Sequence, residues 1–276
     1  MKKCLVMMLL CVFITGVPAI AAFASPKLGV SYTAGIDNYP SVGNGGNVVT
    51  SMPFTYGVSY ADSGLLTSSI VGSSAVQAIA RADYGSLGAY AYAQGPGIGY
   101  AGGFVDCYAQ AYAEWRDVWT ITTPGMTGKP GTLELAWTVN GTESTQNDTY
   151  PSPHDYWVFY LSGPSHQLGR GSMSGVVDLP ITFGSAREIV SDFKLNSVAG
   201  RGFSPGAIGY TGLDFLDTAK ITGIVVLDGT GKEISNFTLV AESGHNYLSS
   251  VPIPGAIFLL GPGLVGLAAI RRRFKK

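Results

Sequence analysis

Residues 73–121 read SSAVQAIARADYGSLGAYAYAQGPGIGYAGGFVDCYAQAYAEWRDVWTI, and their pattern is the strongest indication of the fold. In three separate runs a small residue recurs at every second position: Ala78, Ala80, Ala82; Ala89, Ala91, Ala93; Ala109, Ala111, Ala113. A period of two places such residues on one face of a β-strand. Alanine also favours helix, which leaves a helix over 109–119 as an alternative. The alternation nevertheless favours strands with one closely packed face.

The rest of the body continues the strand pattern. Apolar and polar residues alternate over 133–139, which predicts a half-buried strand that ends in an Asn140-Gly141 turn, followed by a polar loop over 142–153. Further strands are predicted over 156–161, 176–183 and 189–195, and a hairpin joins 221–227 to 234–240. Ten or more strands without a long helix predict an all-β fold, a β-sandwich, with a jelly-roll-like arrangement as one option.

Residues 1–24 have the features of a cleavable N-terminal signal peptide. Two lysines precede the apolar run 5–14, and Ala22 and Ala24 form an A-x-A cleavage site directly before Ser25. The Sec translocon and signal peptidase are therefore expected partners. Residues 25–250 would then form an exported, β-rich body.

The segment 251–276, VPIPGAIFLLGPGLVGLAAIRRRFKK, has three parts in order. An uncharged apolar run over 253–270 would span roughly 27 Å as a helix at about 1.5 Å per residue, close to a hydrocarbon core of about 30 Å. Positive flanks stay cytoplasmic, so the C-terminus is expected inside the cell and the body outside. The proline motif and the basic end consist of Val251, Pro252, Pro254, Arg271, Arg272 and Arg273.

This arrangement resembles the PEP-CTERM sorting signal of Gram-negative bacteria. Pro252-Ile253-Pro254 stands where that family has Pro-Glu-Pro, as in its VPLP-type variant, and residues 259–268 are similar to the family's LLGSGLLGLA, with an unusual Pro262. The resemblance implies recognition by an exosortase in the inner membrane and cleavage near the proline motif. It also implies release or transfer of the body to the cell envelope or the extracellular matrix.

Charge and cysteine content narrow the partners of the body. Residues 25–250 contain ten basic and eighteen acidic residues, a net charge of −8 that the basic termini mask in the whole-chain value of −1. Such a charge argues against nucleic acid and anionic lipid as partners. Cys107 is the one cysteine of the body, so no disulfide can form within it. We expect a buried thiol there, with intermolecular pairing as the alternative.

No motif carries a clear catalytic or metal-binding pattern. The G-x-S-x-G of 202–206 and the G-x-G-x-x-G of 97–102 lack the strand and helix context that such motifs need, and they read as turns. A His154-Asp155 pair would need a distant serine to act as a triad. No zinc pattern links the histidines, which are expected at the surface: His154, His166 and His245.

Two further features leave alternatives open. Acidic residues in turns, near Asp148, Asp214 and Asp228, keep Ca²⁺ as an option, although no cofactor is expected. The many Tyr and Trp residues either fill the core or, when exposed on a sheet, stack on sugar rings. The sequence therefore predicts a non-enzymatic exported surface or extracellular-matrix protein, with a carbohydrate-binding module for exopolysaccharide and a matrix hydrolase as alternatives.

Overall fold

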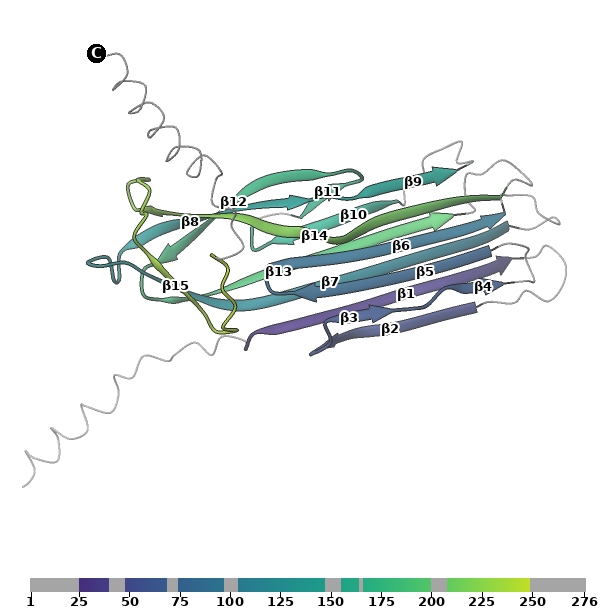
Figure 1. The fold of residues 1–276 in the computed structure, drawn as a ribbon, viewed down its shortest axis with the longest axis horizontal. Helices are drawn as coiled ribbons and strands as arrows, with labels where there is room; N and C mark the ends of the chain where they lie inside the picture. The colour runs from purple at the N-terminus through teal and green to yellow at the C-terminus, as the bar shows by residue number, and fades with distance from the viewer. Residues whose placement is uncertain are drawn as a thin grey trace, which may run out of the picture.

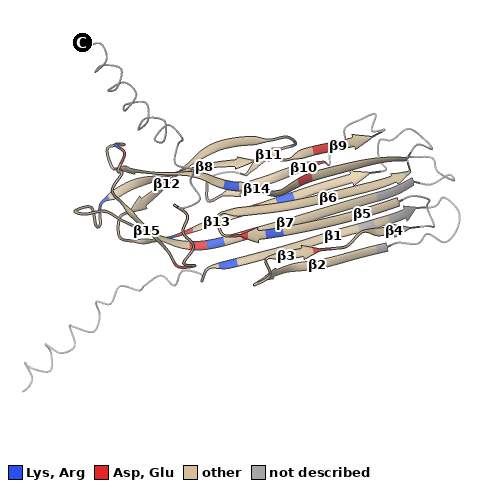
Figure 2. Cartoon of the chain, in the orientation of Figure 1, with Lys and Arg blue, Asp and Glu red and all other residues tan. Residues whose placement is uncertain are grey.

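The computed structural model describes residues 25–39, 48–68, 74–96, 104–146, 155–163, 166–199 and 208–248. Within these ranges the chain forms fifteen strands and no helix, which confirms the all-β prediction. Most strands lie roughly along the long axis of the molecule (Figure 1). Charged residues are sparse along them (Figure 2).

Two antiparallel sheets contain all these strands. Sheet 1 has the order β11-β10-β13-β7-β1-β2, and β15 also pairs with β7. Its strands are β1 (Lys27–Tyr39), β2 (Val48–Tyr56), β7 (Phe104–Thr122), β10 (Tyr156–Leu161), β11 (Gln167–Gly169), β13 (Ala186–Ala199) and β15 (Thr238–Ala241).

Sheet 2 has the order β12-β8-β14-β6-β5-β3, with β4 paired to β5 and β9 paired to β14. Its strands are β3 (Tyr60–Asp62), β4 (Leu66–Ser68), β5 (Ser74–Asp83), β6 (Ser86–Pro96), β8 (Pro130–Val139), β9 (Thr142–Gln146), β12 (Met173–Thr182) and β14 (Ile208–Asp228). Buried side chains of both sheets form one core cluster, so the fold is sandwich-like.

Alanines line one part of this core. The alternating alanines of β5, β6 and β7 are all buried, as the period of two predicted. Cα atoms of β1, β7 and β13 come within 8 Å of Cα atoms on β5 or β6 in the facing sheet. Packed sheets usually lie about 10 Å apart. Small side chains therefore let the two sheets approach unusually closely here, and Cys107, which is fully buried as expected, packs against Gly95.

Large aromatic residues fill the other part of the core. Trp157 packs against Phe193 and Phe215, with ring centroids 6.2 Å and 6.4 Å apart. Trp137 lies 5.0 Å from Phe159, again between centroids, and joins the two sheets. All four tryptophans are buried and help to fill the core, and Trp137 and Phe159 also line a cavity of about 380 Å³.

Two local predictions were wrong. The strand 133–139 ends before Asn140-Gly141 as predicted, but no turn follows, because β8 and β9 pair in succession along the same side of β14. A Cβ at Gly141 would lie 2.3 Å from Phe215, so the kink between β8 and β9 accepts only glycine. The predicted loop 142–153 accordingly begins with a strand, β9.

The predicted hairpin of 221–227 with 234–240 was also wrong in part, because the two segments pair only next to the turn that joins them. Asp228 and Lys232 close that turn with a 2.9 Å backbone hydrogen bond, and Leu227 bridges Glu233. The chain then crosses to sheet 1, where β15 pairs with β7. The remaining predicted strands are confirmed, and residues 109–119 are strand, not helix.

Candidate ligand-binding face

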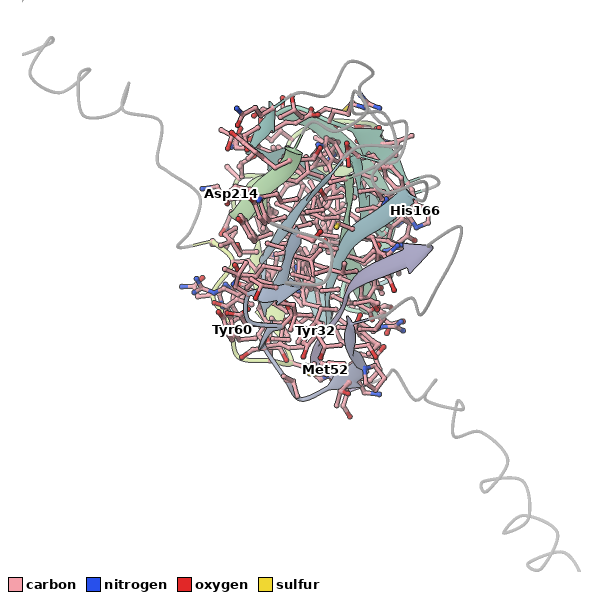
Figure 3. The ribbon with its side chains drawn as sticks, turned by 90° about the vertical axis from the view of Figure 1, so that its right-hand side faces the viewer. Tyr32, Met52, Tyr60, His166 and Asp214 are labelled. Atoms are coloured by element: carbon pink, nitrogen blue, oxygen red, sulfur yellow. The ribbon has the colours of Figure 1, made fainter. Side chains whose placement is uncertain are left out.

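Tyrosines occupy the outer faces of the sheets because their positions alternate with the buried alanines. In β6, Tyr90 and Tyr92 are half-buried on the side opposite Ala89 and Ala91, and in β7 Tyr112 is placed likewise. Figure 3 shows the labelled residues His166 and Asp214 on opposite sides of the molecule, outside sheet 1 and sheet 2 respectively. The tyrosines of these outer faces are candidate ligand-binding aromatics.

The outer side of sheet 1 carries a cluster of polar and aromatic residues, which we call the sheet 1 face. Its members project from β2, β7 and β13, and β1 lies between β2 and β7. Those on β7 and β13 alternate with buried residues, since successive side chains point to opposite sides of a sheet. The sheet 1 face consists of Tyr56, Gln110, Tyr112, Glu114, Arg116, Asp192 and Lys194.

Glu114 is the centre of the sheet 1 face. The residue is only 4% exposed, and its carboxylate accepts hydrogen bonds from the hydroxyls of Tyr56, at 2.9 Å, and Tyr112, at 2.7 Å. The Arg116 guanidinium donates a third bond and forms an ion pair with it. Both carboxylate oxygens are thus occupied, so Glu114 fixes the two tyrosines and is not an available acid or base.

Aromatic and cationic groups extend this cluster toward the edge strand β2. Phe54 lies edge-on to Tyr56 and Tyr112, with centroids 4.9 Å and 5.2 Å apart. The Lys27 ammonium lies 4.8 Å from the Tyr56 ring centroid, within the range of a cation–π contact. Phe54 rests on Gly29, where an added Cβ would come within 2.5 Å of its ring.

Asp192 faces Glu114 directly across the β7–β13 ladder. Burial raises the pKa of Asp192 to about 6, while nearby His166 opposes the rise and the Glu114 charge adds to it. His166 itself is exposed, as predicted, and packs on the ring of Tyr160 at a centroid distance of 4.8 Å. The sheet 1 face therefore carries a carboxylate that titrates close to neutral pH.

A hollow of about 300 Å³ lies beside this cluster. It is lined by Ser31, Tyr32, Thr33, Gln110, Ala111, Tyr112 and Lys194, from β1, β7 and β13. Gln110 donates a 2.7 Å hydrogen bond from Nε2 to Oδ1 of Asn196, which orients its amide. Hydroxyl, amide, aromatic and ammonium groups thus meet at one depression on the sheet.

A second buried carboxylate, Asp117, holds the last described segment of the chain. It accepts bonds from the Tyr247 hydroxyl at 2.9 Å and from the Ser243 backbone amide at 3.1 Å, and from the Ser243 hydroxyl. His245 lies nearby, but its backbone amide, not its ring, bonds to the Ser243 hydroxyl. A serine nucleophile needs an imidazole base, so this group is a structural clasp and not a triad.

The outer side of sheet 2 is a simpler aromatic surface. Tyr92 and Tyr210 lie 6.0 Å apart between centroids, and Tyr92 contacts Gly212 on the neighbouring strand. The Tyr92 hydroxyl donates to the Gln94 side chain. Among the described cavities none lies on this surface, which makes it a weaker candidate than the sheet 1 face.

Several predicted site residues lie outside the described part of the chain. These are the signal-cleavage residues Ala22 and Ala24, His154, both glycine motifs, and the sorting residues Val251, Pro252, Pro254, Arg271, Arg272 and Arg273. Ser25 is exposed, just before β1. Asp155 is buried and accepts a 2.8 Å bond from the Val198 amide, which gives it a structural role.

Within the described ranges no group of three or more His, Cys, Asp or Glu residues could hold a metal ion. The described residues also include no helix that is long and apolar enough to cross a membrane. Sequence reasoning did not single out Glu114, Asp192, Lys194 or Gln110. In β7, Gln110 and Glu114 stand at even positions like Tyr112, whereas the buried alanines stand at odd positions. This alternation could have indicated that both residues face outward.

The chain matches no protein-family model, no curated protein and no solved structure. Its function must therefore be argued from its own residues.

Proposed function

We propose that the protein is a non-enzymatic, exported surface or extracellular-matrix protein that is sorted through residues 251–276. The observation that carries the proposal is the ordered succession of proline motif, apolar run and arginines in that segment. The A-x-A site before Ser25 and the acidic body of residues 25–250 support the same route.

The sorting route has defined steps. The Sec translocon and signal peptidase act first, and the 253–270 helix then holds an inner-membrane intermediate with its C-terminus in the cytoplasm. An exosortase reads the segment and the body passes to the cell envelope or the medium. We also propose that the strands of the sandwich have a jelly-roll-like arrangement.

A non-enzymatic role is supported by how the buried carboxylates are used. Glu114 and Asp117 each accept several hydrogen bonds from neighbouring side chains and backbone. Neither residue lines any of the described cavities. Asp178 and Glu188 do line described cavities, but each stands without a second carboxylate or a histidine among the lining residues, whereas glycoside hydrolysis uses a pair of carboxyl groups. A matrix hydrolase is therefore the less favoured alternative.

The test of sorting is mass spectrometry of the protein recovered from inner membrane, envelope and medium. Replacing Arg271, Arg272 and Arg273 by Ala should leave a species in the inner membrane that retains the segment 251–276. A matched control replaces the body residues Lys129, Lys220 and Lys232 by Ala, and it should be processed like the wild type. If the arginine variant is released as efficiently as the wild type, the sorting proposal is wrong.

Glycan binding is the second candidate function, and the sheet 1 face favours it. Half-buried tyrosines, a hydrogen-bonding amide pair and a hollow occur together there. Aromatic rings with a polar edge suit the alternating apolar and hydroxyl surfaces of sugars. Such a module would retain exopolysaccharide at the cell surface.

A further inference from the structure

We propose that the hollow between β1, β7 and β13 is a subsite for one uncharged sugar unit of a polysaccharide. This inference deepens the second candidate function, glycan binding, and rests on it. It does not depend on the sorting route. The hollow, at about 300 Å³, is at the lower end of the range for ligand pockets, which suits a single ring of a longer chain.

The hollow offers the donors and acceptors that sugar hydroxyls need. Among the described residues no ion pair involves Lys194, so its ammonium keeps its donors available. Gln110 uses its Nε2 on Asn196, which leaves its carbonyl oxygen as an acceptor. Ser31 and Thr33 add two hydroxyls, each able to donate and accept.

The walls of the hollow are held in place before any ligand arrives. The hydroxyl of Tyr112 is fixed by Glu114 at 2.7 Å, and Glu114 is in turn held by Tyr56 and Arg116. Binding costs less when the side chains that contact the ligand are already ordered. The Glu114 cluster therefore acts as support for the hollow and does not itself line it.

The net charge of the body disfavours acidic sugars. On the sheet 1 face Glu114 and Asp192 balance Arg116 and Lys194, so the net charge of −8 on residues 25–250 sets the long-range field. A carboxylated polysaccharide would be repelled by this field, whereas a neutral one would not. Binding of a neutral sugar through hydrogen bonds should also depend little on salt.

Exposed aromatic residues next to the hollow provide a second contact for a chain. Phe54 and Tyr56 are 37% and 40% exposed, and the Phe54 ring packs against Tyr112 at the wall of the hollow. A sugar ring linked to the one in the hollow would thus meet an aromatic surface. Oligosaccharides should accordingly bind more tightly than the monosaccharide.

The experiment is calorimetric titration of the full chain in a detergent without a sugar headgroup. The probes are neutral hexasaccharides of glucose, mannose and xylose, their monosaccharides, and an alginate hexasaccharide as the acidic probe. The wild type should bind at least one neutral hexasaccharide with similar affinity at low and high salt. Lys194→Met and Thr33→Val remove polar groups without loss of volume, and Lys194→Met should weaken binding at least about tenfold.

Lys220→Met, on the exposed side of β14 in sheet 2, is the matched control and should bind like the wild type. Unchanged melting temperatures would show that the variants fold. If no neutral glycan binds, both the inference and the glycan-binding candidate fail, while sorting is decided by its own experiment. If the wild type binds and both hollow variants bind equally well, or if only alginate binds in a salt-sensitive way, the hollow is not the subsite.

Discussion

The hydroxyl of Tyr247 donates a 2.9 Å hydrogen bond to Oδ2 of Asp117, and both residues are buried. This bond joins the segment that follows β15 to the middle of the core, where Tyr247 also packs on Trp119 at a centroid distance of 4.4 Å. Burial, followed by the Asp117 charge, raises the pKa of Tyr247, so its hydroxyl stays protonated and remains a donor. The residues just before the predicted sorting segment are thereby held against sheet 1.

Asp117→Ala should lower the free energy of unfolding by about 3 kcal/mol, because it removes the acceptor of the buried Tyr247 hydroxyl and of the half-buried Ser243 hydroxyl. Tyr247→Phe removes one bond and should cost about 1–2 kcal/mol. Urea unfolding measures both, and the double variant should show that the two losses are not additive. Asp178→Ala, at an exposed position of β12, serves as the control and should change stability by less than about 0.5 kcal/mol. An Asp117 variant as stable as that control would show that the clasp contributes nothing.

The close contact of Gly95 with Cys107 gives a second prediction. A Cβ added at Gly95 would lie 2.8 Å from the Cys107 Sγ, so Gly95→Ala should destabilise the protein by about 1–3 kcal/mol through overpacking. Cys107→Ala removes the clashing sulfur, and the double variant should recover part of the loss. Chemical unfolding of the two single variants and the double variant measures the coupling. Additive losses would mean that the sheets are not in close contact at this point.

Asp192 gives a pH-dependent prediction. Its folded pKa of about 6 lies above the ordinary value of 3.8, so the fold binds this proton more tightly than the unfolded chain does. The contribution of the protonated Asp192 carboxyl to the free energy of unfolding is therefore fully present below about pH 4 and is lost as the pH rises through about 6. Asp192→Asn should remove that dependence and should raise stability at neutral pH by about 1–2 kcal/mol, after allowance for its partial exposure to solvent.

Urea unfolding across this pH range, with Asp178→Asn as an exposed control, tests the prediction for Asp192. The wild type and the Asp192 variant should be equally stable below about pH 4, diverge between about pH 4 and 6, and keep a constant difference at higher pH. Parallel curves for the two proteins would contradict the raised pKa.

The sequence predicted which residues alternate between buried and outward-facing positions in the strands, but it did not predict which strands pair. Period-two alanines identified β5, β6 and β7, and alternating apolar residues identified β8, because strand burial is a local pattern. The turn at 228–231 was also predictable, because its Asp-Gly-Thr-Gly sequence is typical of turns. In the structure Thr230 and Lys232 donate hydrogen bonds to the Asp228 side chain within that turn. The strand that follows it pairs with β7 in the other sheet, and such a choice depends on contacts remote in sequence.

The sheet 1 face could not be predicted from the sequence for the same reason. Glu114 and Asp192 lie far apart in the chain, and only the β7–β13 register places them opposite one another. Tyr56 reaches Glu114 from β2 across the intervening strand β1. A local pattern gives the outward direction of these side chains but not which of them meet.

Glu114 offers the last test, because it links the stability of sheet 1 to the proposed sugar subsite. Glu114→Ala removes the acceptor of the Tyr56 and Tyr112 hydroxyls and of Arg116, so it should destabilise the protein by about 2–4 kcal/mol. Tyr112→Phe keeps the ring and loses one bond, and it should cost about 1 kcal/mol. Thermal and urea unfolding measure both.

The variant Glu114→Gln separates charge from geometry at the same position. Its amide oxygen can still accept a hydrogen bond, but its NH₂ group cannot, and the charge that pairs with Arg116 is gone. Its stability should therefore lie between that of the wild type and Glu114→Ala. If Glu114→Gln is as stable as the wild type, the ion pair with Arg116 contributes nothing and the tyrosine hydroxyls need only one acceptor. If it is as unstable as Glu114→Ala, the carboxylate charge is what fixes Tyr56 and Tyr112 beside the hollow.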